Sequence, residues 1–312
     1  MSKCLYCYNK LESSEADFHP ACSKKFFNSQ IPPLVDLDMK RIKELAVESL
    51  GKSISVPGVQ PKLSLDFKKE KGKESRLTIV GLWGRFILKP PFEDYPEMPE
   101  LEDLTMYMSE LLNINTAEHS LIKLKSGELA YLSKRFDRTK DEKLHVEDMA
   151  QLTETLTENK YRGSMERIGK IILKYSSYPG IDAIRFFELT LFSFITGNSD
   201  MHLKNFSLLR NEEDEIILSP AYDLLSTKLL IPKDKEDLAL PLNGKKNNFK
   251  KKDFDLFASQ LGINEAALRK IYMKFADSFP DMNRLINKSF LSTEMKEKYL
   301  VLLYERSKVI WN

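Results

Sequence analysis

Two polar side chains, Asp200 and Asn205, stand five residues apart in a short loop that follows a strongly apolar run. A carboxylate can accept the proton of a hydroxyl nucleophile, and an amide oxygen is a hard ligand of the kind that magnesium binds. The apolar run at 186–195 predicts a buried helix, which Gly197 ends. A polar loop held between two apolar segments fixes its side chains on a rigid base. We therefore expect this loop to carry the chemistry.

The Asp-x4-Asn spacing is that of a protein-kinase catalytic loop, in which the aspartate orients the substrate hydroxyl and the asparagine holds magnesium. After Asn205, two short apolar strands at 206–209 and 216–218 predict a hairpin that brings Asp223 near Asn205. Asp223 would supply a second hard oxygen ligand. Its position also permits a helix N-cap, and both interpretations stay open from these residues alone.

A lysine and a glutamate upstream suit the phosphate-binding part of such a site. Lys89 ends a predicted strand at 85–89, where it could reach a bound phosphate, although a solvated lysine is more common at a strand end. The amphipathic helix predicted at 99–114 carries Glu102, which could pair with Lys89 as the helix glutamate does in kinases. The small residues at 53–62 suit either a loop over nucleotide phosphates or a plain hairpin loop.

All three cysteines fall within the first 22 residues, in the pattern Cys4-x2-Cys7-x11-His19-x2-Cys22. Three thiolates and one imidazole can close a tetrahedral zinc site that has no open position for water. The pattern therefore predicts a structural zinc site, and the alternative is three reduced cysteines in a turn-rich cap.

The composition limits the classes of protein to which the chain can belong. The 312 residues are 42% hydrophobic and 30% charged, which is typical of a globular protein large enough for two packed lobes. With 48 basic and 46 acidic side chains the net charge is +2, so no large direct contact with nucleic acid is expected. The chain shows neither a signal peptide nor an apolar run long enough to span a membrane, and its cysteines make no disulfide framework. We expect a cytoplasmic protein without membrane contact.

These segments predict an α+β fold with the two lobes of a protein kinase. Residues 1–35 would form a Cys/His-rich cap with the zinc site. Residues 36–138 would form a small, mostly antiparallel β lobe with the phosphate loop, and residues 139–312 a helical lobe with the catalytic loop.

Several motifs, taken in order, resemble the HipA family of toxin kinases, the serine/threonine kinases of bacterial toxin–antitoxin systems. They are Ser-Ile-Ser-Val-Pro-Gly-Val-Gln-Pro-Lys (53–62), Phe-Ile-Leu-Lys-Pro (86–90), Lys-Arg-Phe-Asp-Arg (134–138), His-Val-Glu-Asp-Met-Ala-Gln (145–151), Gly-Asn-Ser-Asp-Met-His-Leu-Lys-Asn-Phe-Ser (197–207) and Ser-Pro-Ala-Tyr-Asp-Leu-Leu-Ser (219–226). The last two motifs, in this order, are highly specific. The resemblance runs from about residue 50 to the C-terminus.

The resemblance implies a role for each matching residue of the catalytic centre. Asp200 is similar to the catalytic base, and Asn205 and Asp223 are similar to the magnesium ligands. Lys89, paired with Glu102, is similar to the lysine that binds the ATP phosphates.

Further family positions concern adenine binding and autophosphorylation. Main-chain groups around Lys134 and Phe136 would hold the adenine, and His202 is a further ATP-binding candidate. Ser55 matches the serine that family members autophosphorylate. Ser53 gives the Ser-x-Ser form of the shorter, HipT-like members, which lack the N-terminal subdomain of the longer ones.

The resemblance also implies partners. The chain would use ATP and magnesium to phosphorylate a protein substrate, such as an aminoacyl-tRNA synthetase, and would autophosphorylate in its serine loop. A small, separately encoded antitoxin or subdomain-like protein and a DNA-binding antitoxin would be its partners.

Two other interpretations remain open. The chain could be a weakly active nucleotide-binding regulator in an antitoxin or repressor complex, although its near-neutral charge argues against a large direct DNA contact. It could also be a metal-dependent hydrolase that uses Asp200, His202 and Asp223, although a hydrolytic site usually needs more nitrogen or carboxylate ligands.

Overall fold

The computed structural model describes residues 2–13, 16–50, 61–68, 75–80, 83–95, 97–139 and 142–311, so the predicted serine loop with Ser53 and Ser55 lies outside the described residues. The chain divides into two units. Unit 1 comprises residues 1–103, 117–135 and 288–290, and unit 2 comprises residues 104–116, 136–287 and 291–312. The Cys/His-rich segment is thus part of unit 1, and the division runs through helix α3 (Met98–Leu111).

Unit 1 is built on a six-stranded sheet with the strand order β1-β3-β2-β4-β6-β5. Its strands are β1 (Leu34–Val35), β2 (Leu63–Lys68), β3 (Arg76–Ile79), β4 (Phe86–Lys89), β5 (His119–Lys123) and β6 (Leu129–Lys134). Neighbouring strands are antiparallel, except that β1 and β3 are parallel. The predicted small and mostly antiparallel β lobe is confirmed.

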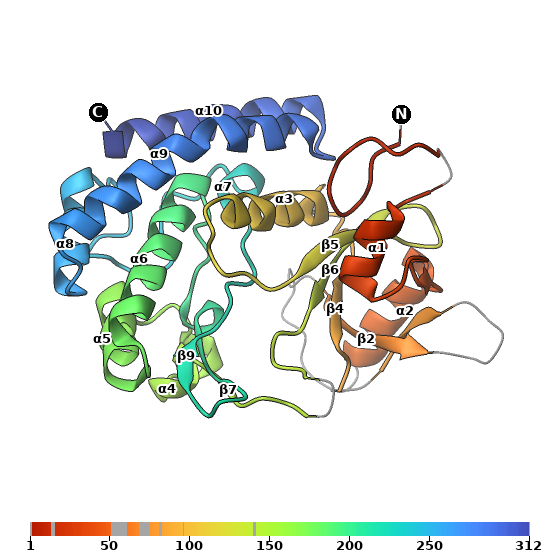
Figure 1. Cartoon of the computed structure of the whole chain (residues 1–312), viewed down its shortest axis with the longest axis horizontal. Helices are drawn as coiled ribbons and strands as arrows, with labels where there is room; N and C mark the ends of the chain where they lie inside the picture. The colour runs from red at the N-terminus through yellow and green to blue at the C-terminus, as the bar shows by residue number, and fades with distance from the viewer. Residues whose placement is uncertain are drawn as a thin grey trace. The chain divides into compact units, whose positions relative to one another are not determined.

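Helix α1 (Pro20–Phe27) packs on this sheet, next to α2 (Met39–Leu50) and the strands in Figure 1. Phe26 and Phe27 of α1 contact Phe86 of β4, with ring centroids 6.1 Å and 6.5 Å apart. Phe86 and Leu88 share one buried face of β4, as their alternation predicts. The next residue, Lys89, therefore points to the opposite face of the sheet.

Unit 2 is mainly helical, as predicted (Figure 1). Its central helix is α6 (Pro179–Thr196). Packed on it are α5 (Met165–Tyr175), α8 (Lys251–Gln260), α10 (Thr293–Trp311) and strand β9 (Ile216–Leu218). The other helical elements are α4 (Met149–Leu152), η1 (Thr157–Asn159), η2 (Leu203–Asn205), α7 (Thr227–Leu230) and α9 (Glu265–Lys288). Three buried hydroxyls of α6 donate to carbonyls four residues earlier, so they need no outside partner.

A second, three-stranded sheet lies in unit 2, with the antiparallel order β7-β8-β9. Its strands are β7 (Val146–Asp148), β8 (Ser207–Arg210) and β9 (Ile216–Leu218). The β8–β9 hairpin matches its prediction. Within the predicted helical lobe the chain first pairs with β8 over β7, and only then does Asp148 cap α4 through a capping box with Gln151.

Strands in unit 1 and helices in unit 2 confirm the predicted two-lobed α+β fold. The part of the chain that the structure describes contains no helix long and apolar enough to cross a lipid bilayer.

Candidate active site

Unit 1 carries a buried ion pair between Lys89 at the end of β4 and Glu102 on α3. Lys89 Nζ lies 2.5 Å from Glu102 Oε1, and the two side chains are 6% and 1% exposed. Lys89 Nζ also lies 5.4 Å from the ring centroid of Tyr131, its neighbour on β6. The interpretation of Lys89 as a solvated strand-end lysine is therefore wrong. A lysine fixed by a helix carboxylate is the arrangement with which kinases hold nucleotide phosphates.

Unit 2 carries the loop with Asp200 and Asn205. Helix α6 ends at Gly197, which takes the left-handed conformation (φ 69°) and turns the chain into the loop. The Asp200 side chain is 48% exposed, so it is accessible to a substrate. Asn205 is buried, and its Nδ2 donates a hydrogen bond to the Asp200 carbonyl (3.1 Å). This bond orients the amide and leaves Oδ1, the atom that a magnesium ion would need, at its other end.

The side chain of Asp200 is held by a residue that the sequence did not point to. The Tyr161 hydroxyl donates to Asp200 Oδ1 (2.7 Å), and the Tyr161 ring meets the His202 ring edge to face at 5.2 Å. Burial and the Asp200 carboxylate raise the pKa of Tyr161 above its usual range, so the phenol stays a donor.

His202 is buried between these groups. Its Nε2 lies 4.0 Å from Asp200 Oδ2, and its Nδ1 has no hydrogen-bond partner among the described residues. Burial lowers the pKa of His202, while the charges of Asp200 and Asp223 oppose that shift. His202 is therefore neutral near pH 7.

Asp223 lies in the left-handed backbone region, with φ 60°. The next helix, α7, begins after Ser226 as its N-cap, so the interpretation of Asp223 as a helix N-cap is wrong. A non-glycine residue in this conformation is costly and is often found at functional sites.

The neighbouring Tyr222 links the Asp223 segment to the loop that carries Asp200 and Asn205. Its hydroxyl contacts the carbonyl of Lys204 (2.8 Å) and the hydroxyl of Ser207 (2.6 Å). Lys204 in turn pairs with Asp148, the cap of α4, at 3.0 Å. The loop, the hairpin and α4 are thus linked by side chains around Asn205.

The two predicted adenine-binding positions have different surroundings. The Lys134 amide donates to the Glu118 carbonyl (2.8 Å), and its Nζ lies 2.5 Å from Glu118 Oε2, so its amide and its side chain both contact Glu118 in unit 1. Phe136, in unit 2, packs on Tyr222 with ring centroids 5.5 Å apart. Phe136 is therefore linked, through Tyr222, to the loop with Asn205.

The oriented amide of Asn205 and the carboxylate of Asp223 offer oxygen donors of the kind that magnesium binds. Among the described residues, one group of three or more His, Cys, Asp or Glu side chains is close enough to share a metal, and it does not include Asp200, His202 or Asp223. This distribution disfavours the hydrolase interpretation, which needs those three residues around one ion.

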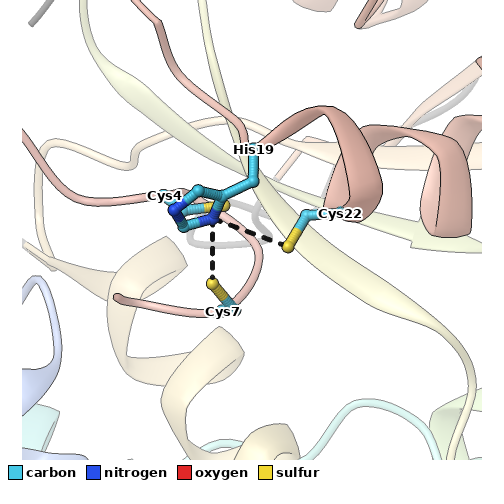
Figure 2. A group of neighbouring side chains, drawn as sticks. All are labelled: Cys4, Cys7, His19 and Cys22. Carbon is cyan, nitrogen blue, oxygen red and sulfur yellow. Dashed lines mark hydrogen bonds between the residues drawn. The ribbon is translucent and has the colours of Figure 1, made fainter. Parts of the chain in front are cut away.

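That one group is the predicted zinc set. Cys4, Cys7, His19 and Cys22 turn their side chains toward one another, with all ligand atoms within 4.8 Å (Figure 2). His19 Nδ1 lies 3.4 Å from the sulfur of Cys7 and 3.7 Å from that of Cys22. The fold therefore gathers the four residues that the sequence pattern singled out.

Tyr161 and Tyr222 were missed by sequence reasoning for different reasons. Tyr161 reaches Asp200 across 39 residues, and its surrounding segment has no periodic pattern or motif. Tyr222 stands directly before Asp223 within a motif already singled out, and this position is a signal that could have identified it.

Comparison with known proteins places the chain in a family. A family model for the HipA-like C-terminal domain matches residues 54–282. "Putative kinase Y4dM" of Sinorhizobium fredii is 36% identical over 185 residues, which cover 55% of this chain and 45% of that protein, so the match spans less than half of that relative. A Haemophilus influenzae protein with the same kinase description is 25% identical, over 93% of this chain and 92% of the relative.

Solved structures share the fold. The HipA toxin–antitoxin structure of Shewanella oneidensis, solved with HipB and operator DNA, contains a chain with a TM-score of 0.67 and 21% identity, over 85% of this chain and 70% of that one. The kinase CtkA of Helicobacter pylori gives a TM-score of 0.56 and 18% identity, over 80% and 94% of the two chains. The family model extends over most of the sequence, including Lys89, Glu102, Asp200, Asn205 and Asp223. The chain belongs to the family of HipA-like C-terminal domains.

Proposed function

We propose that this protein is an ATP- and magnesium-dependent serine/threonine protein kinase of a HipA-type toxin–antitoxin system. The observation that carries the proposal is the loop in which Asp200 is exposed while Asn205 is buried and oriented by the Asp200 carbonyl. The kinase descriptions of the Sinorhizobium and Haemophilus relatives support the proposal.

Each part of the reaction has a residue suited to it. Lys89, held by Glu102, would position the ATP phosphates. Asp200 would accept the proton of the attacking hydroxyl, and neutral His202 beside it adds no competing positive charge. Asn205 and Asp223 would hold magnesium, which when bound neutralises charge on the phosphates.

Tyr161 would be a positioning residue for Asp200. Its hydroxyl holds one carboxylate oxygen, Oδ1, which leaves Oδ2 for the substrate hydroxyl. Because the Tyr161 ring also packs on His202, one side chain orients two members of the site.

Labelled ATP tests the proposal directly. We expect wild-type protein with magnesium and γ-labelled ATP to transfer label to protein, and Asp200→Asn to lose about 10²–10⁴-fold in rate. Asp214→Asn is a matched control, because Asp214 is an exposed aspartate in the β8–β9 turn. Equal labelling by wild type and Asp200→Asn would remove Asp200 from the chemistry. Binding of ATP without any transfer by the wild type would favour the nucleotide-binding regulator instead.

Autophosphorylation at Ser55, with Ser53 as a second candidate, is part of the proposal. A phosphoserine carries close to two negative charges, so in a loop over nucleotide phosphates it would repel ATP. We expect phosphorylated wild type to bind ATP more weakly than Ser55→Ala. Equal affinities would show that Ser55 is not a switch.

The proposed partners are a protein substrate, such as an aminoacyl-tRNA synthetase, and a DNA-binding antitoxin. The Shewanella chain was solved with HipB and operator DNA, which supports an antitoxin complex for this chain. A net charge of +2 favours DNA contact through that partner over a large direct contact.

A further inference from the structure

The Cys4, Cys7, His19 and Cys22 cluster has the dimensions of a zinc site. In tetrahedral zinc coordination, bond lengths of about 2.3 Å to sulfur and about 2.0 Å to nitrogen put a sulfur and a nitrogen ligand roughly 3.5 Å apart. The distances from His19 Nδ1 to the Cys7 and Cys22 sulfurs are 3.4 Å and 3.7 Å. These two separations match those that a bound ion would impose, and all four ligand atoms lie within 4.8 Å of one another (Figure 2).

The protonation of the His19 ring also suits a metal ligand. His19 Nε2 lies 3.0 Å from the Lys10 carbonyl, and a carbonyl can only accept a hydrogen bond. The proton of neutral His19 is therefore on Nε2, and the lone pair of Nδ1 faces the sulfurs. A backbone carbonyl that fixes the far nitrogen is the usual outer partner of a metal-bound histidine.

The four ligands lie on two short segments of the chain. A turn carries Cys4 and Cys7, and it is closed by a hydrogen bond from the Tyr8 amide to the Cys4 carbonyl (2.9 Å). His19 is the N-cap of α1, and Cys22 lies in the first turn of that helix. The two segments are bridged where the Leu5 amide donates to the Asp17 carbonyl (2.9 Å).

The turn also reaches the proposed nucleotide-binding pair. Tyr8 is buried, and its hydroxyl donates to Asp103 Oδ2 (2.5 Å). Asp103 Oδ1 lies 2.7 Å from Nδ1 of buried His119. Asp103 follows Glu102 on α3, and the His119 ring stacks on Tyr131, the ring beneath Lys89. The residue next to Cys7 is therefore linked through Asp103 both to the α3 turn that carries Glu102 and to the rings that pack at Lys89.

We propose that Cys4, Cys7, His19 and Cys22 bind one zinc ion, and that this ion holds Tyr8 on Asp103 and so sets the position of Glu102. Binding takes the cysteines as thiolates, and their protons pass to solvent. The coupling to Glu102 rests on the proposed function, because it assumes that the Lys89–Glu102 pair binds ATP. The zinc site itself does not depend on that assumption.

Metal analysis of the purified protein tests the site. We expect one zinc per chain in the wild type and loss of that zinc in Cys7→Ser and His19→Gln. His145→Gln is the matched control, because it removes an exposed histidine outside the cluster and should keep the zinc. Wild type without zinc, or His19→Gln with full zinc, would overturn the site.

A second measurement, cobalt absorption of the wild type, tests the site without any cysteine variant that could fail to fold. Wild type stripped by a chelator and reloaded with cobalt should show thiolate-to-cobalt charge-transfer absorption together with the visible bands of tetrahedral cobalt. A pale octahedral spectrum without charge transfer would overturn the coordination by the three cysteines.

The coupling is tested with Tyr8→Phe, which keeps the ring and removes the hydroxyl that meets Asp103. We expect this variant to keep its zinc but to bind ATP about 5-fold more weakly. Tyr6→Phe is the control: Tyr6 lies in the same turn as Cys4 and Cys7, but its ring packs on Phe26 of α1. Unchanged ATP affinity in Tyr8→Phe would overturn the coupling. Failure of zinc-loaded wild type to bind ATP at all would instead overturn the proposed function, and the coupling with it.

Discussion

The Lys89–Glu102 pair places two opposite charges where water is excluded. Removing either charge from water is costly, and the contact between them offsets that cost. We expect Lys89→Met to lower the free energy of unfolding by about 3–5 kcal/mol, because buried Glu102 loses the positive charge 2.5 Å from its carboxylate. Urea unfolding followed by circular dichroism measures the change.

A double variant separates this cause from lost packing. Lys89→Met with Glu102→Leu removes both charges, and apolar replacements of a buried pair are often neutral or stabilising. The double variant should therefore be more stable than Lys89→Met alone. If the two are equally unstable, the loss does not come from the stranded carboxylate.

Glu100 should make stability depend on pH. Burial, with Glu97 and Asp103 nearby, raises the pKa of this carboxyl from 4.5 to about 7. Because the folded pKa lies above the unfolded one, the native state binds more protons between these values, and stability falls as pH rises through about 7. At pH 8 we expect Glu100→Gln to be more stable than the wild type by up to about 3 kcal/mol. At pH 4.5 or below the difference should be small.

Glu110→Gln is the control for Glu100→Gln, because Glu110 is an exposed glutamate on the same helix. Unfolding midpoints at pH 5 and pH 8 give the comparison. An advantage of Glu100→Gln that is the same at both values would contradict a titrating carboxyl.

For single residues, the sequence predicted contacts between recognisable helices, strands and motifs, and missed contacts between irregular segments. The order of strand and helix was enough to suggest that Lys89 and Glu102 pair. The spacing of the cysteines was enough to predict which four residues form the zinc cluster. The bond from Tyr161 to Asp200 joins two irregular segments, and only the folded backbone brings them together.

Among the elements, the end of α6 decides where the loop with Asp200 and Asn205 begins. Gly197 has φ 69°, and a Cβ there would lie 2.7 Å from Leu302 Cδ2 and 3.1 Å from Lys228 Cβ. Gly197→Ala combines backbone strain with a clash, so we expect it to destabilise the protein by about 2–4 kcal/mol and to lower the labelling rate. Thermal unfolding and the labelled-ATP assay measure the two effects.

Gly262→Ala isolates the backbone contribution. Gly262 has φ 75°, and a Cβ there would meet no heavy atom of the described residues within 4 Å. This variant should therefore show the backbone strain alone, about 1 kcal/mol. Similar losses in the two variants would mean that contact with Leu302 and Lys228 is unimportant.

The predicted elements succeed where periodicity is long and fail where pairing or packing overrides local preference. Helix α6 and the β8–β9 hairpin follow from apolar runs and a breaking glycine or polar turn. Strand β7 has three residues, too few to show alternation, and it forms because β8 pairs with it. Helix α9 continues through Pro280, a residue that usually breaks or kinks a helix, since Met282 and Ile286 are buried beyond it.

For the whole molecule, the proposed function predicts that bound Mg–ATP stabilises the folded chain. A ligand that binds only the folded state raises stability according to its concentration relative to its dissociation constant. The thermal midpoint is therefore a measure of binding that does not require phosphate transfer.

We expect Mg–ATP at a hundred times its dissociation constant to add about 2.7 kcal/mol to the stability of the wild type, which corresponds to a rise in the thermal midpoint of roughly 4 °C. At the same concentrations Asp200→Asn should keep most of this rise, because Asp200 acts on the substrate hydroxyl. Lys89→Met should lose the rise in the midpoint because it no longer binds the ATP phosphates. Asp223→Ala should lose it because it no longer holds magnesium. ATP without magnesium should reduce the rise in the wild type to the level of Asp223→Ala. An undiminished rise in Asp223→Ala would show that Asp223 does not hold the metal, and would leave Asn205 without its partner in the proposed site.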